Sequence, residues 1–119
     1  MSEPVLHHAQ VFYPRGREAD ARAFYVDQLG LREIDRLVTE SVGLWFGAGE
    51  GQVHLSTEDD PHLHPRRHFA LRVDSLDRAV ARLRAAGARF EEATPIPGWR
   101  RIYVFDPFGN KIELDEIPS

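Results

Sequence analysis

The chain has 119 residues, of which 42% are hydrophobic and 29% are charged, a composition typical of one ordered globular domain with its own core. It contains no cysteine, which excludes disulfides, a thiol nucleophile and a cysteine-ligated zinc site, so any metal ion must be held by nitrogen and oxygen atoms. A net charge of −4 weighs against nucleic acid as a partner, and without a secretory leader or a run of about 18 apolar residues we expect a cytoplasmic protein that does not enter a membrane.

The first half of the sequence predicts a strand, a helix and three further strands. Residues 6–13 alternate between apolar and polar side chains, which is the pattern of a half-buried strand. Apolar residues then recur every three or four positions over 18–29 and stop at Gly30, which is suited to cap a helix in a left-handed conformation. Three short β-like runs follow, at 31–38, 41–47 and 52–57.

The second half repeats this order. Residues 67–73 alternate like a strand, and Asp74 or Ser75 can cap a helix that closes at Gly87. Three more strands are predicted at 88–92, 100–105 and 110–116. We therefore expect a single domain of the α+β class, built of two βαβββ modules at about 5–58 and 66–117.

Four side chains that can bind metal fall at equivalent positions of this repeat. His68 follows His8 by 60 residues, and Glu113 follows His54 by 59. Each lies on the strand face opposite the apolar stripe, so helices that cover the apolar faces would leave all four in one cleft. Three imidazoles and a carboxylate suit one divalent ion, such as Zn²⁺, Ni²⁺, Co²⁺, Fe²⁺ or Mn²⁺. Taken singly, each residue also has an ordinary interpretation as a hydrogen-bonded or solvated side chain.

Several neighbouring residues are interpreted as structural. His7 is expected to point away from His8, toward the helix layer. The turn at 106–110 has the proline and glycine that a tight turn requires. Trp45 and Trp99 either line the cleft or fill the core, and the sequence does not distinguish between these two places.

A set of short motifs extends over nearly the whole chain. They include His8-Ala9-Gln10-Val11, Val53-His54-Leu55, His68-Phe69-Ala70-Leu71-Arg72-Val73-Asp74 and Asp106-Pro107-Phe108-Gly109-Asn110-Lys111-Ile112-Glu113-Leu114. Together these motifs resemble the vicinal oxygen chelate superfamily, which groups glyoxalase I, bleomycin resistance proteins and extradiol dioxygenases. The resemblance implies a curved mixed sheet, or half-barrel, with helices on its outer face. Inside it, one metal ion would be held by His8, His54, His68 and Glu113.

The resemblance also implies a class of chemistry. Metal-using members bind a small molecule through two neighbouring oxygens, and the metal stabilises the negative charge that develops on them. A lyase, an isomerase or a dioxygenase would follow, with Glu113 and His54 as catalytic residues. The ligands of extradiol dioxygenases match His8, His68 and Glu113, which leaves His54 as a fourth ligand or an acid–base group. Phe12 stands where glyoxalase I has a contact to glutathione, which points away from that activity.

Two further expectations follow from the resemblance. A partly aromatic substrate pocket would be lined by Phe12, Phe46, Arg72, Arg101, Tyr103 and Phe105. Members commonly form homodimers, so the ligands of one site come either from one chain or from two. The alternative function is that of the bleomycin resistance proteins, which sequester an antibiotic in a cleft between two subunits and lack a full set of metal ligands.

Overall fold

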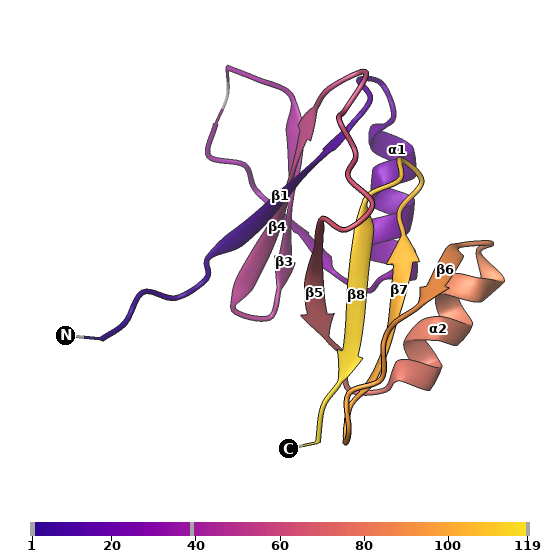
Figure 1. Cartoon of the computed structure of the whole chain (residues 1–119). Helices are drawn as coiled ribbons and strands as arrows, with labels where there is room; N and C mark the ends of the chain where they lie inside the picture. The colour runs from indigo at the N-terminus through magenta and orange to yellow at the C-terminus, as the bar shows by residue number, and fades with distance from the viewer. Residues whose placement is uncertain (1, 39, 119) are drawn as a thin grey trace.

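The computed structural model describes residues 2–38 and 40–118 of the chain. They form two βαβββ modules, each with a four-stranded mixed sheet (Figure 1). The first module consists of β1 (His8–Tyr13), α1 (Glu18–Arg22), the π-helical η1 (Ala23–Gln28), β2 (Arg32–Ile34), β3 (Gly43–Ala48) and β4 (Gly51–Thr57). The second consists of β5 (His68–Arg72), α2 (Leu76–Ala85), β6 (Arg89–Glu92), β7 (Arg100–Phe105) and β8 (Lys111–Glu116).

The two sheets share one topology, with strand orders β1-β4-β3-β2 and β5-β8-β7-β6. In each module the first strand pairs in parallel with the last, and the other pairs are antiparallel. β1 and β5 therefore stand at the ends of their sheets, and each has one edge that pairs with no strand of the described residues. The register places His54 between Gln10 of β1 and Trp45 of β3, and Glu113 beside Tyr103 of β7.

Helix α2 forms for local reasons that the sequence shows. Ser75 Oγ accepts a hydrogen bond from Arg78 N at 3.2 Å, so it caps the helix as predicted. Leu76 and Leu83 are buried on one face, which holds the helix against its sheet. Gly87, at φ +83°, ends the helix in the left-handed conformation that glycine adopts without strain.

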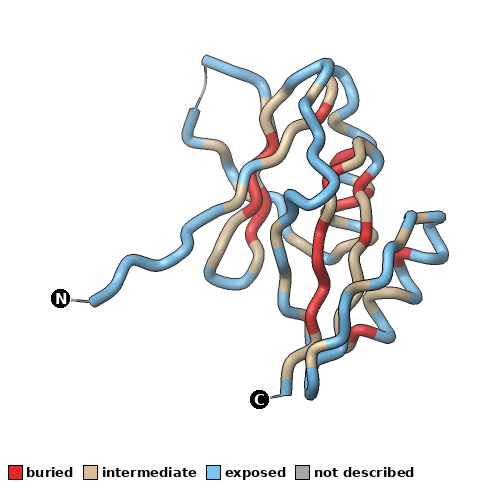
Figure 2. The backbone as a smooth tube through the Cα atoms, in the orientation of Figure 1, coloured by how far each residue is buried: buried red, intermediate tan, exposed pale blue. Residues whose placement is uncertain are grey.

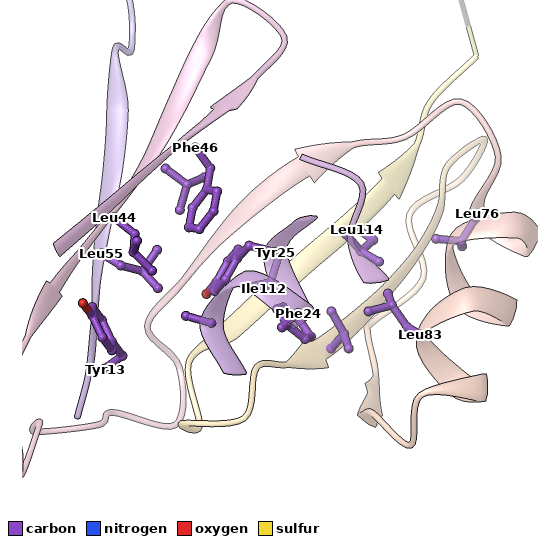
Figure 3. Close-up of a cluster of buried hydrophobic side chains, with 13 residues drawn as sticks. Tyr13, Phe24, Tyr25, Leu44, Phe46, Leu55, Leu76, Leu83, Ile112 and Leu114 are labelled. Atoms are coloured by element: carbon purple, nitrogen blue, oxygen red, sulfur yellow. The ribbon is translucent and has the colours of Figure 1, made fainter. Parts of the chain in front are cut away.

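The hydrophobic core lies between the two sheets and the first helix. Figure 3 shows Phe24 and Tyr25 between Phe46 of the first sheet and Ile112 of the second. The Tyr25 ring stacks on the Phe46 ring with centroids 5.3 Å apart, and the Tyr25 hydroxyl donates to Asp106 Oδ2 at 2.7 Å. This hydrogen bond joins the first module to the β7–β8 turn of the second. Buried backbone follows β4 and β8, whereas the segment before β1 is exposed (Figure 2).

The predicted βαβββ order is confirmed in both modules, with two differences in detail. β2 ends at Ile34 and does not reach residue 38, and beyond its end the Arg36 guanidinium donates to Ser41 O at 2.6 Å. The half-barrel is also open, since within residues 2–38 and 40–118 no strand pairing joins one sheet to the other. None of the helices described is long and apolar enough to cross a membrane.

Candidate functional site

On the first sheet, His8 and His54 share one face with Trp45. The His54 and Trp45 rings are parallel within 3°, with centroids 4.0 Å apart, and the His8 ring also stacks on His54 at 4.0 Å. His54 Nε2 lies 2.8 Å from Gln52 Oε1. His54 is only 6% exposed, whereas His8 at the start of β1 is exposed. We call His8, His54 and Trp45 the aromatic half-site.

The surroundings of His54 favour its neutral form. Burial lowers the pKa of His54 to about 4, and charge on His8, His7 and Arg36 acts in the same direction. His7 belongs to these surroundings, because its ring meets the His8 and His54 rings edge-on at centroid separations of 5.2 and 6.5 Å. The expectation that His7 points toward the helix layer is therefore wrong. His7 precedes β1, where strand alternation does not yet fix the direction of a side chain.

On the second sheet, His68 and Glu113 form the matching pair. His68 Nε2 is 3.1 Å from Glu113 Oε1, and Arg101 Nη1 is 3.2 Å from Glu113 Oε2. The Tyr103 ring meets the His68 ring edge-on with centroids 5.1 Å apart. The side chain of Glu113 is 8% exposed and that of His68 is 30% exposed, so the carboxylate is held firmly while the imidazole stays accessible. We call His68, Glu113 and Arg101 the charged half-site.

A second carboxyl group stands beside Glu113. Asp115 lies two residues further along β8 and is also buried. Burial, together with the neighbouring Glu113, raises the pKa of Asp115 to about 6. Burial also pushes the pKa of Glu113 upward, but hydrogen bonds to Asp115 and Arg101 bring it below its ordinary value. When the two carboxyl groups share one proton, the proton therefore resides on Asp115 and Glu113 stays ionised.

A cleft lies between the modules, where residues 29–31, α2 and strand residues line it, and of the two half-sites only His8 and His68 belong to its lining. Its volume is about 1050 Å³. A smaller cavity of about 410 Å³ is lined by Phe12, His68 and Lys111 among others. In the part of the chain that the structure describes, however, no group of three or more His, Asp or Glu side chains is placed to hold one metal ion. The four predicted ligands therefore form two pairs and not one cluster.

In the charged half-site, His68 and Glu113 form a hydrogen-bonded pair whose spacing also fits two ligands of one metal ion. With metal–ligand bonds of about 2.1 Å, two ligand atoms on one ion lie roughly 3.0–3.4 Å apart. The separation of 3.1 Å between His68 Nε2 and Glu113 Oε1 falls in this range. One imidazole nitrogen and one carboxylate oxygen suit a divalent ion such as Zn²⁺ or Mn²⁺, although an ion needs further ligands than these two.

The predicted substrate-binding residues have different surroundings. Phe12 lines the smaller cavity, and Arg72 lines the cleft. Arg101 and Tyr103 contact Glu113 and His68 directly, so they belong to the charged half-site. The Phe105 ring is covered by an arginine guanidinium whose central carbon lies 3.8 Å from the ring centroid. Four of these five residues therefore lie beside a cavity or a predicted ligand.

The structure corrects the assignment of Phe46 to the pocket. Phe46 is fully buried on the face of β3 opposite His54, and it packs on Tyr25 in the core. Its neighbour Trp45 stands on the ligand face instead. Residues 44–46 are Leu-Trp-Phe, all apolar, so alternation does not indicate which of them faces the core.

Two further residues of the ligand face were not predicted as site residues. Asp115 and Lys111 lie two positions either side of Glu113, and alternate residues of a strand point to the same side. Lys111 Nζ is 3.1 Å from Glu91 Oε1 and lies 4.1 Å from the centroid of the Tyr103 ring. The spacing of two residues from Glu113 is the signal that identifies both.

Comparison with known proteins assigns the family. Residues 5–114 match the family model of the Glyoxalase/Bleomycin resistance protein/Dioxygenase superfamily. The chain belongs to this superfamily. A relative, the uncharacterized protein YwkD of Bacillus subtilis (strain 168), is 31% identical over 93% of this chain and 95% of its own length.

Solved structures agree with this family assignment. A putative glyoxalase family protein from Bacillus anthracis is 33% identical, with a TM-score of 0.86 over 99% of this chain and 100% of that chain. The fosfomycin resistance protein FosX from Listeria monocytogenes is 20% identical, with a TM-score of 0.81 over 99% of this chain and 94% of that chain. A mutant of FosX is known in complex with Mn(II) and 1S,2S-dihydroxypropylphosphonic acid. The resemblance inferred from the sequence motifs is confirmed.

Proposed function

We propose that the protein is a divalent-metal-dependent enzyme that acts on a small molecule with two neighbouring oxygen atoms. The ligands of this proposal are His8, His68 and Glu113. The observation that carries it is the spacing of 3.1 Å between His68 Nε2 and Glu113 Oε1, with Arg101 paired to the other carboxylate oxygen. Support comes from FosX, which shares the fold and of which a mutant is complexed with Mn(II) and 1S,2S-dihydroxypropylphosphonic acid, a 1,2-diol.

A second copy of the chain completes the site in this proposal. His8 begins β1 and His68 begins β5, and each of these strands is the end strand of its sheet. An exposed edge carries N–H and C=O groups that are ready to pair with another chain. Pairing β1 of one copy with β5 of the other would bring His8 to the charged half-site of its partner. Two-fold symmetry would then form two equal sites in one homodimer.

The residues of the chain prepare the site for a substrate. When bound, the metal would supply Lewis-acid stabilisation of the negative charge that develops on a substrate oxygen. Arg101 holds Oε2 of Glu113, which leaves Oε1 directed at His68. Phe12 and Lys111 line the cavity next to His68 and would offer an apolar wall and a cation to the bound molecule. The catalytic roles of Glu113 and His54 remain predictions.

Metal binding by the wild type and two variants tests the proposal. After treatment with a chelator, the wild type should bind about one Mn²⁺ or Zn²⁺ per chain in a calorimetric titration. His68→Ala and Glu113→Ala each remove a direct ligand and should weaken binding at least about 100-fold. Glu92→Ala, at an exposed carboxylate of β6 that is not in the lining of either cavity, is the control and should bind like the wild type. A wild type that binds neither ion would overturn the enzyme proposal and favour the antibiotic-binding alternative.

A mixing experiment tests the shared site separately. His8→Ala and Glu113→Ala each remove one side of every site, so neither homodimer should bind metal tightly. In a heterodimer of the two variants, the intact His8 and the intact Glu113 meet at one of the two sites. Co-expression should therefore restore about one tightly bound ion per heterodimer. If the wild type binds metal but the heterodimer recovers none, the ligands come from a single chain.

A further inference from the structure

His54 lies inside a stack of three rings. Trp45 covers one face of its imidazole and His8 covers the other, both with centroid separations of 4.0 Å. The residue is 6% exposed, as is the proposed ligand Glu113, so the arrangement of the rings and not burial decides whether His54 can bind the ion. The His8 and His54 rings are therefore stacked face to face, and they do not lie edge to edge around a common point.

The geometry of this stack is incompatible with two ligands on one ion. The lone pair of an imidazole nitrogen lies in the plane of the ring, so an ion bound by two histidines must lie close to both ring planes. The planes of His8 and His54 are inclined by only 17°, with centroids 4.0 Å apart. An ion about 2.1 Å from a nitrogen of each ring would have to lie well outside the plane of at least one ring, where that nitrogen has no lone pair to offer. Only one of these two histidines can therefore bind a given ion in this arrangement.

The surroundings of the two rings select which of them is the ligand. Each ring has one nitrogen engaged, His54 Nε2 with Gln52 Oε1 at 2.8 Å and His8 Nδ1 with His7 Nδ1 at 3.0 Å. His54 is enclosed by a ring on each face, whereas His8 is exposed, so the His8 ring can turn toward an ion and the His54 ring cannot. A flat, fixed ring behind an exposed one restricts the rotamers of the exposed ring and reduces the entropy lost when it binds.

From these contacts we infer that His54 is a positioning residue that holds the ring of His8 against a rigid aromatic wall, and that it is not a metal ligand. The inference rests on the proposed function, in which His8 binds the metal. It removes His54 from the predicted set of four ligands and assigns it a role that a ring without nitrogen can perform. The site then has two histidines and one carboxylate, with positions left for substrate oxygens.

The test compares two substitutions of the same residue. His54→Phe keeps a flat ring between Trp45 and His8 but has no nitrogen, and Mn²⁺ or Zn²⁺ affinity should stay within about threefold of the wild type. His54→Ala removes the wall, and affinity should fall about 3- to 10-fold, as expected for the loss of one ring-stacking contact. If His54 is a ligand, both variants should lose metal about equally, by 100-fold or more. Equal loss in the two variants, or wild-type affinity in both, would overturn the inference.

A second measurement does not depend on how the variants fold. X-ray absorption of the Zn²⁺-loaded wild type should show two imidazole ligands, and three would overturn the inference. Failure of the proposed function has a different signature, because the wild type would then bind no ion at all. In the variants, His8→Ala serves as the positive control, since it removes a direct ligand and should abolish tight binding.

Discussion

The aromatic and the charged half-sites occupy equivalent places in the two modules but are held by different forces. On the first sheet, a neutral and buried His54 is fixed by stacking between Trp45 and His8. On the second sheet, Glu113 is fixed by an ion pair with Arg101 and by contact with His68. The repeat therefore places polar residues on matching strands, while the side chains around them decide how each one is held.

This difference predicts how the two half-sites respond to substitution. Stacking is worth about 0.5–1.5 kcal/mol per aromatic pair, and it tolerates any flat ring. A buried carboxylate that loses its cation is left uncompensated, which costs considerably more. Substitutions in the charged half-site should therefore affect metal binding more strongly than conservative substitutions in the aromatic half-site.

The largest expected change in stability comes from the core, and comparing it with a substitution in the aromatic half-site distinguishes the two regions. Phe46 and Trp45 are neighbours on β3 that point to opposite faces. Phe46→Ala should lower the free energy of unfolding by about 3–5 kcal/mol, because it opens a cavity in the core. Trp45→Leu should cost only about 1 kcal/mol, because it removes a stacking contact at a half-buried position. Urea unfolding of the metal-free protein measures both, and equal costs would place Trp45 in the core.

The next effect concerns the arginine of the charged half-site. Arg101→Gln leaves Glu113 and Asp115 side by side without a cation, so the pair retains a proton that a metal ion must displace. We expect metal affinity to fall about 10- to 100-fold, the usual range for a residue that orients a ligand. Arg100→Gln is the matched control, since its exposed guanidinium binds Asp77 on the other side of the strand. In calorimetric titrations, equal affinities for the two variants would contradict the role of Arg101.

The elements of the fold and the faces of the ligands were predictable from local pattern. Alternation places His8 opposite Ala9 within a single strand, and the helical stripe before Gly87 needs no knowledge of the rest of the chain. The family motifs are also local in sequence, and the family match is confirmed over residues 5–114. Features that are set by neighbouring residues in the sequence could therefore be predicted.

The remaining features depend on register and on contacts between strands. Arg101 meets Glu113 only because β7 and β8 pair antiparallel with Tyr103 opposite Glu113, and no pattern within one strand specifies that pairing. The stack of His54 on Trp45 likewise depends on the register of β3 and β4. The separation of the ligands into two pairs depends on how two sheets are placed relative to each other, which periodicity does not describe.

The smallest effect tests the hydrogen bond that joins the two modules. Tyr25 donates to Asp106 Oδ2 at 2.7 Å, and burial raises the pKa of Asp106, although hydrogen bonds from Asn110 and Tyr25 oppose this rise. Tyr25→Phe removes one donor from the carboxylate and should lower the free energy of unfolding by about 1.5 kcal/mol at pH 7. Tyr13→Phe is the matched control: among the described residues the buried Tyr13 hydroxyl makes no hydrogen bond within normal geometry, and burial and the nearby Glu18 carboxylate raise its pKa to about 12, so its loss should cost less than that of the Tyr25 hydroxyl.

The pH dependence of this penalty has a definite sign. A carboxyl group with a raised pKa in the folded protein favours folding at low pH, and this contribution is lost as the pH rises through the folded pKa. Without the Tyr25 donor the folded pKa of Asp106 rises further, so the variant loses more stability than the wild type as the pH increases. The difference between the two proteins in urea unfolding should therefore be smaller at pH 4.5 than at pH 7. An equal difference at both pH values would mean that the Tyr25 hydroxyl does not act through the charge of Asp106.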